Sequence, residues 1–103
     1  MITALFYMTV KSERDNEWCE LLLQLGESTR TQDDGCLHYV FHRRLDNPRE
    51  YVLYEQWRDG EALAAHLARL VRLLGSPPPG GRLPAKFLDL FEQTHGVLYE
   101  PLG

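Results

Sequence analysis

The most constraining feature of this chain is a strand pair that leads directly into an amphipathic helix. Segments 36–45 and 50–58 are rich in aromatic and β-branched residues, and they flank a four-residue turn at 46–49. This arrangement is typical of a β-hairpin. Asp59 then predicts a helix N-cap, and leucines at helical spacing predict a helix over about 60–74. Its expected buried stripe is Leu63, Leu67, Leu70 and Leu74, with His66 beside it.

The segment before the hairpin predicts one strand and one helix. Apolar residues alternate from Ile2 to Val10, as in a strand with one buried face. Ser12 precedes an acidic first turn, so we expect a helix from there to about Thr31. Its apolar stripe is Trp18, Leu21, Leu22 and Leu25, and the turn Asp33-Asp34-Gly35 ends it.

The last quarter of the chain predicts a loop, a short helix and a strand. Residues 75–84 are so rich in proline and glycine that we expect no regular structure there, either as a disordered insertion or as a lid. Pro84 is expected to start a short helix through about Gln93, with Phe87, Leu88 and Phe91 facing inward. A final strand is expected over 95–102.

This order of elements is the split β-α-β-β-α-β pattern, so we predict a single α+β domain over residues 1–103 with a ferredoxin-like antiparallel sheet. Pairing Leu45 with Glu50 across the turn sets the expected hairpin register. One face then carries Cys36, His38, Val40, His42, Leu53, Glu55 and Trp57, and the other carries Leu37, Tyr39, Phe41, Val52 and Tyr54. An uncovered face this apolar exceeds what monomers tolerate, which predicts a homodimer through the sheet faces.

Composition narrows the classes of partner. The chain has 11 basic and 15 acidic residues, a net charge of −4, which argues against nucleic acid or an anionic membrane as the main partner. No apolar run reaches the length of about 20 residues that a membrane span needs. The N-terminus lacks the basic segment of a signal peptide, so we expect a cytoplasmic protein with reduced Cys19 and Cys36. Cys36, His38 and His42 share a strand, but strand spacing disfavours their convergence on one metal ion.

Several of these segments together resemble the antibiotic biosynthesis monooxygenase (ABM) family. The resemblance rests on the aromatic strand 36–41, an Asp-x-Pro turn at 46–48, Tyr-Glu-x-Trp at 54–57, and Ala-x-x-x-His at 62–66. It implies a dimeric α+β barrel. It also implies a cofactor-independent monooxygenase that oxidises a small aromatic phenol or quinol with O₂ as co-substrate. Such enzymes bind the ring in a cavity between sheet and helices, where the electron-rich phenolate itself reduces O₂.

The candidate site residues combine Trp57, which the resemblance carries over, with others chosen for their chemistry and place in the chain. His66 would be a catalytic base or hydrogen-bond donor, because imidazole titrates near neutral pH, and Trp57 would orient the substrate through its ring and N–H. The further substrate-binding candidates are Tyr7, His38, Tyr54, Glu55 and Phe91. Each has a structural alternative: a core histidine for His66, a core anchor for Trp57, and for Glu55 a buried ion pair with an arginine.

Two alternative functions remain open at this stage. Other members of the family bind and degrade haem, and they carry an Asn on the first strand and a Trp on or near the second helix. Neither residue stands at the corresponding place in this chain, which weakens the haem alternative. The second alternative is a non-catalytic dimeric module that binds a small ligand, because a fold does not dictate an activity.

Overall fold

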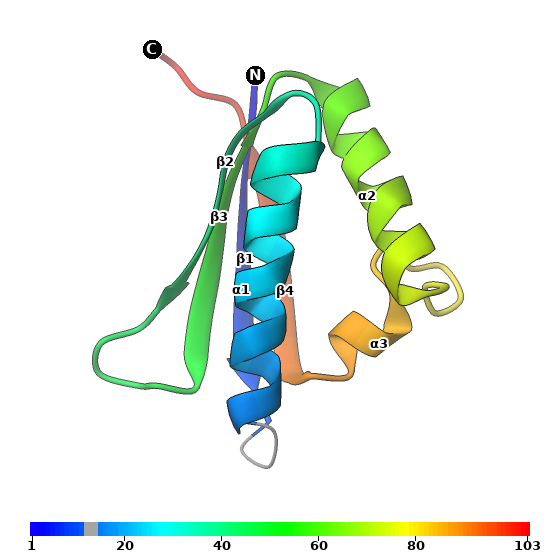
Figure 1. The fold of residues 1–103 in the computed structure, drawn as a ribbon. Helices are drawn as coiled ribbons and strands as arrows, with labels where there is room; N and C mark the ends of the chain where they lie inside the picture. Colours follow the sequence, from blue (N-terminus) through cyan, green and yellow to red (C-terminus); the bar gives the residue numbers. More distant parts are fainter. Residues whose placement is uncertain (12–14) are drawn as a thin grey trace.

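The computed structural model describes the backbone of residues 1–11 and 15–103, and the side chains of 1–11 and 18–103. Its elements are β1 (Ile2–Val10), α1 (Asp15–Gln32), β2 (Cys36–Arg43), β3 (Glu50–Trp57), α2 (Gly60–Leu74), α3 (Ala85–Leu88) and β4 (Phe91–Tyr99). The four strands form an antiparallel sheet in the order β2-β3-β1-β4. All three helices contribute buried residues to one core against the sheet (Figure 1). The predicted α+β, ferredoxin-like fold is therefore confirmed.

The first strand and helix follow the sequence pattern closely. β1 has the predicted bounds, and in α1 Trp18, Leu22 and Leu25 are buried as expected, with Leu21 half-buried. The predicted helix start at Ser12 lies outside the described residues. None of the described helices combines the length and the apolarity that crossing a bilayer requires.

The hairpin register differs from the prediction by one residue. The Arg44 N–H donates to the Glu50 carbonyl at 2.9 Å, so a five-residue loop joins the strands instead of a four-residue loop. Asn47 organises this loop, because its side chain accepts from the Arg49 N–H at 3.1 Å and its carbonyl from the Glu50 N–H at 3.1 Å. Because side chains alternate between faces, a shift of one residue transfers every β2 side chain to the other face.

The face predicted for several β2 residues is consequently wrong. Tyr39 lies opposite Glu55 and Phe41 opposite Leu53, so both aromatic rings face the helices rather than the open side. His38, Val40 and His42 share the open face with Val52 and Tyr54. Cys36 remains beside Trp57 on the helix-facing side, because a bulge interrupts the ladder between Cys36 and His38.

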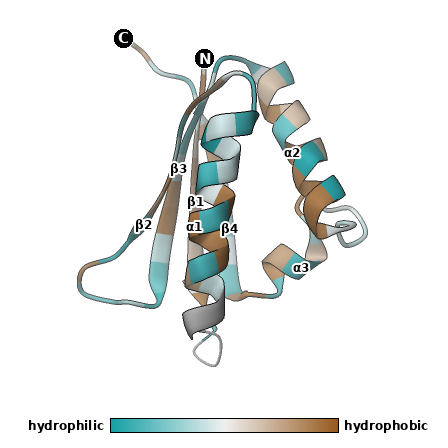
Figure 2. Ribbon diagram, viewed as in Figure 1, coloured by the Kyte–Doolittle hydropathy of each residue, from teal (hydrophilic) through white to brown (hydrophobic). Residues whose placement is uncertain are grey.

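Helix α2 begins and ends where predicted. The Asp59 side chain caps it by accepting a hydrogen bond from the Ala62 N–H at 2.8 Å. Figure 2 shows hydrophobic and hydrophilic residues alternating around the helix. The predicted stripe is correct for Leu70, and Leu63, Leu67 and Leu74 pack against the core, but the centre of the buried face is displaced. The buried residues are Ala62, His66 and Leu70, whereas Leu63, Leu67 and Leu74 are half-buried, so His66 lies at the centre of the packed face.

A close contact with the α1–β2 turn sets this rotation of α2. Gly35 has φ +82°, a left-handed conformation that favours glycine, and a Cβ there would lie 2.6 Å from the Ala62 Cβ. Glycine facing alanine therefore allows the turn and α2 to approach each other. This approach brings Asp33, just before Gly35 in the chain, next to His66 on α2.

The C-terminal part is irregular over residues 75–84, as predicted. The predicted boundaries of the helix and strand that follow are wrong. Helix α3 ends at Leu88 rather than near Gln93, and β4 begins at Phe91 rather than at His95. The long β1 strand explains the earlier start, because β4 pairs along it and a register shift near Val10 brings Val10 opposite Phe91. Phe87, Leu90 and Phe91 are buried, with the Phe87 and Phe91 ring centroids 5.1 Å apart.

The sheet face opposite the helices is uncovered and partly apolar. Tyr7 and Val40 are 44% and 39% exposed on this face. Near the hairpin end it contains a depression of about 450 Å³, whose lining includes Tyr7, His42, Val52 and His95.

Candidate active site

The candidate site is centred on His66, which pairs with Asp33. The imidazole is only 2% exposed, and its Nδ1 lies 2.5 Å from Asp33 Oδ2. An ionised carboxylate only accepts hydrogen bonds, so a neutral His66 carries its proton on Nδ1. No described residue forms a hydrogen bond with Nε2, whose lone pair is therefore available for a proton. A carboxylate that orients an imidazole in this way is the arrangement found around many general bases.

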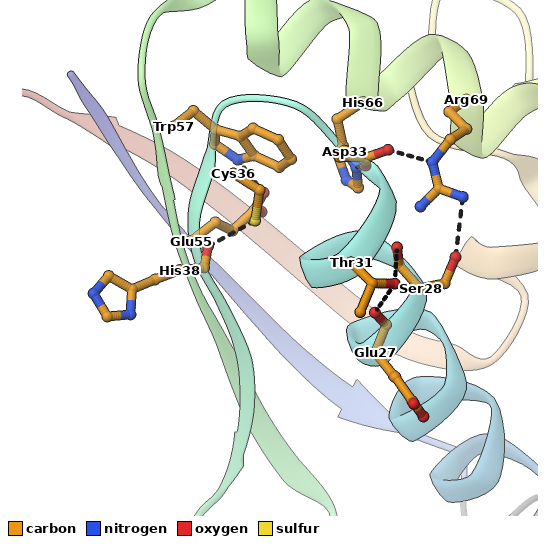
Figure 3. Close-up of polar contacts among 10 residues, drawn as sticks. All are labelled: Glu27, Ser28, Thr31, Asp33, Cys36, His38, Glu55, Trp57, His66 and Arg69. Carbon is orange, nitrogen blue, oxygen red and sulfur yellow. Dashed lines mark hydrogen bonds and ion pairs between the residues drawn. The ribbon is translucent and has the colours of Figure 1, made fainter.

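Asp33 is itself held in place by residues of both helices. Arg69 Nε donates to Asp33 Oδ1, and Arg69 Nη1 donates to Ser28 Oγ at 3.0 Å (Figure 3). The Asp33 side chain is largely buried, so its charge depends on Arg69 for compensation. The cluster thus connects the end of α1 to the middle of α2, and it fixes the orientation of the His66 ring.

Two aromatic residues of the sheet enclose the imidazole. The Trp57 ring lies 4.6 Å from the His66 ring and is completely buried. Tyr39 contacts the imidazole edge-on, with ring centroids 5.1 Å apart. These apolar surfaces exclude water from His66. Burial accordingly lowers the pKa of His66, although the neighbouring Asp33 carboxylate raises it in part.

Glu55 adds a buried carboxyl group on the other side of Trp57. Its Oε1 accepts a hydrogen bond from the Trp57 indole N–H at 2.8 Å, and the residue is 9% exposed. No Arg or Lys among the described residues forms the ion pair that the sequence suggested as an alternative. Burial raises the pKa of Glu55 from its ordinary 4.5 to about 7, with the Trp57 hydrogen bond acting in the opposite direction. Near neutral pH, therefore, this carboxyl group can both release and accept a proton.

A groove of about 380 Å³ leads from the surface to His66. Its lining includes Asp33 and residues of α2, among them Ala62, Ala65, His66 and Arg69. This volume lies within the range of about 300–1,000 Å³ that is typical of small-ligand sites. The groove therefore offers an approach to His66 from the solvent.

The structure separates the remaining sequence candidates from this cluster. Tyr7, His38 and Tyr54 lie on the open face of the sheet, where Tyr7 stacks on His95 and His38 contacts Tyr54. Figure 3 shows the His38 side chain pointing away from Trp57 and His66. Phe91 packs beside Phe87 at the far end of β4. Of the predicted site residues, only His66, Trp57 and Glu55 belong to the buried cluster around the imidazole.

Three residues of the cluster were not anticipated from the sequence. Asp33 was interpreted only as part of a turn, and the predicted register placed Tyr39 on the opposite face. Arg69 had a usable signal, since it follows His66 by three residues and such residues are neighbours on a helix. Both cysteines are free thiols, and the described part of the chain contains no group of three or more residues placed to ligate a metal ion.

Comparison with known proteins assigns the family. The sequence model of antibiotic biosynthesis monooxygenases matches residues 1–70. This chain belongs to the ABM family. The matched region contains the whole candidate site described above, from Ser28 to Arg69, whereas α3 and β4 lie beyond it.

Solved structures of ABM proteins share the complete fold. A crystal structure of an antibiotic biosynthesis monooxygenase is 25% identical, with a TM-score of 0.76 and 100% of both chains covered. A Deinococcus radiodurans protein given the same family name is 24% identical, with a TM-score of 0.74 over 98% of this chain and 92% of that one. A third, from Bacteroides thetaiotaomicron, is 19% identical, with a TM-score of 0.77 over 98% and 89%. No curated protein matches the chain.

Proposed function

We propose that this ABM protein is a cofactor-independent monooxygenase that oxidises a small aromatic phenol or quinol with O₂. The observation that carries the proposal is the buried Asp33–His66 pair against the ring of Trp57. It supplies an oriented base beside an aromatic surface, which is what deprotonation of a phenol requires. Family membership supports the oxidative chemistry.

The proposed reaction needs no electrons from outside. A phenol and O₂ give a quinone and one molecule of water, so the substrate supplies all four electrons that reduce the two oxygen atoms of O₂. His66 accepts the phenolic proton at Nε2, and the electron pair of the O–H bond stays on the phenolate, which then transfers an electron to O₂. Asp33 stabilises the resulting imidazolium.

In this proposal Trp57 packs its ring against His66 and shields the base from water. Its N–H already donates to Glu55, so the indole is not the free donor that the sequence suggested. We place the substrate in the groove that reaches His66. In that position the phenol approaches an imidazole that is only 2% exposed, where electrostatic interactions are strengthened.

We also propose that the protein acts as a cytoplasmic homodimer through the open sheet face. The exposed Tyr7 and Val40 and the depression beside them support such a contact. Analytical ultracentrifugation tests it, since a chain that stays monomeric at micromolar concentration would contradict the proposal.

Oxygen uptake tests the activity directly. Purified, metal-stripped protein is incubated with a panel of hydroquinones and polycyclic phenols in an oxygen electrode. We expect uptake that survives chelation and falls by about 10²-fold or more in His66→Asn, because that is the usual contribution of a general base. Trp57→Phe should also reduce uptake, whereas Glu20→Gln on the exposed side of α1 should not.

Other outcomes would redirect the assignment. No uptake above the spontaneous rate would refute the monooxygenase proposal. A Soret shift on adding haemin would then favour the haem-binding alternative, and no shift would favour a non-catalytic ligand-binding module.

A further inference from the structure

The groove that leads to His66 has a highly charged lining. Guanidinium groups and carboxylates surround the approach to the imidazole, which constrains the chemistry of any ligand that enters. The charged members of the lining are Arg58, Arg69, Arg72, Asp33, Asp34 and Glu61. The ion pairs among them decide which charge is available to a ligand.

Ion pairs within the protein neutralise two of the arginines. Arg69 binds the buried carboxylate of Asp33, and Arg58 lies 3.5 Å from the carboxylate of Asp34. Arg72 is exposed, and it forms neither an ion pair nor a hydrogen bond with the part of the chain that the structure describes. Among the described residues of the lining, Arg72 is thus the cation that remains available to a ligand.

The unpaired charges of the lining lie at opposite ends of the groove. Glu61 is in the first turn of α2 and Arg72 is in its last turn, with His66 between them on the same helix. An anionic group in the groove is therefore attracted toward the Arg72 end and repelled from the Glu61 end. The structural alternative is that Arg72 only stabilises the helix terminus through the helix dipole.

Hydrogen-bond donors outnumber acceptors on the wall between His66 and Arg72. Arg69 projects from the same side of α2 as His66 (Figure 3). Its Nε and Nη1 donate to Asp33 and Ser28, but its Nη2 is buried without a hydrogen-bond partner among the described residues. Buried donors are normally satisfied. A ligand that contributes acceptor oxygens suits this wall better than an apolar one.

We propose that Arg72 determines the substrate specificity of the groove, and that the substrate is a phenol that carries a carboxylate group. This inference rests on the proposed monooxygenase function and names its substrate class. The hydroxyl group lies at His66, and the carboxylate pairs with the guanidinium of Arg72, whose planar donors match two carboxylate oxygens. The helix rises by about 9 Å from His66 to Arg72, a distance that one aromatic ring and the flexible arginine side chain span together.

A matched pair of ligands tests the specificity without turnover. The compounds para-hydroxybenzoate and its methyl ester differ in the charge of one group, and isothermal titration calorimetry at low salt measures both Kd values. We expect the wild type to bind the acid at least about fivefold more tightly than the ester, and added salt should reduce this preference. Arg72→Gln should bind both compounds alike, and Arg72→Lys should retain part of the preference. The control Arg43→Gln changes an exposed arginine at the other depression and should behave as the wild type.

Nitrogen NMR locates the bound acid in the groove. The ¹⁵N resonances of His66 should shift when para-hydroxybenzoate is added to the wild type, and Arg72→Gln should need about fivefold more ligand for the same shift. Binding that leaves His66 unperturbed overturns the placement. No binding of the acid by the wild type, equal Kd values for acid and ester, or a preference that survives in Arg72→Gln overturns the role of Arg72.

Turnover separates this inference from the proposed function. Dihydroxybenzoate and its methyl ester are compared in the oxygen electrode. Arg72→Gln should raise KM for the acid by about fivefold or more, while kcat and the KM of the ester stay unchanged. An equal effect on both compounds, or oxidation of the ester alone, overturns the specificity role and leaves the monooxygenase function standing. If the wild type oxidises neither compound nor any member of the phenol panel, the proposed function fails, and the calorimetric preference still decides whether the groove binds an acid through Arg72.

Discussion

Replacing Glu55 with glutamine should change how the stability of the protein depends on pH. In the folded protein the pKa of Glu55 is about 7, whereas its ordinary value is 4.5. The folded state therefore binds more protons than the unfolded state between these two values. The free energy of unfolding must then decrease as pH rises through that interval, and the loss is complete above about pH 8. Below pH 4.5 the carboxyl group is protonated in both states and makes no difference.

The magnitude follows from the separation of the two pKa values. They differ by about 2.5 pH units, and each unit corresponds to about 1.4 kcal/mol, so ionised Glu55 destabilises the fold by on the order of 3 kcal/mol at pH 8.5. Solvent screens this effect little, because the side chain is only 9% exposed. Glutamine cannot ionise, so the variant does not lose this stability as the pH rises. The added amide donors impose a cost of their own, but that cost does not vary with pH.

Urea unfolding followed by circular dichroism measures the effect. Wild type and Glu55→Gln are compared at equal protein concentration between pH 5.0 and 8.5. Part of the loss has already occurred at pH 5.0, so we expect their difference in unfolding free energy to shift in favour of the variant by about 2.5 kcal/mol across this range. This shift corresponds to a Tm change of about 10 °C or more for a domain of this size. The lowered pKa of His66 destabilises both proteins at acidic pH and cancels in the difference. Parallel curves for the two proteins would refute a buried, proton-binding Glu55.

Three further predictions concern the Asp33 cluster and its position. Asp33→Ala should destabilise the protein by about 3–5 kcal/mol in urea unfolding, because it leaves Arg69 buried without its partner. The double variant Asp33→Ala/Arg69→Met should lose much less unfolding free energy than the two single variants lose in sum. Strict additivity would contradict the pairing. Gly35→Ala should lower the Tm, because φ is +82° and Ala62 occupies the space; a neutral result would show that α2 can move away freely. In ¹⁵N NMR, His66 should titrate below pH 6.5 with its proton on Nδ1, and at still lower pH in Asp33→Asn; a titration above 6.5 would contradict this environment.

Much of the architecture was predictable because its causes are local. The β1 alternation, the Asp59 cap and the proline-rich loop each depend on residues a few positions apart, and all three were predicted correctly. The family signal likewise lies in short motifs, and it led to both Trp57 and His66. Trp57 ends a strand that leads directly into the helix of His66, so these two residues were expected to be neighbours.

The identity of the residues around His66 was decided only by the tertiary structure. One additional residue in the hairpin loop placed Tyr39 under α2 rather than on the open face, since strand side chains alternate with a period of two. The contact of Gly35 with Ala62 selected the buried face of α2 and brought Asp33 to His66 across 33 positions of sequence. Glu55 ended beside Trp57 with no ion-pair partner among the described residues, and its burial raised its pKa. Sequence patterns describe each element with its close neighbours along the chain, whereas the protonation states of this site depend on groups that only folding brings together.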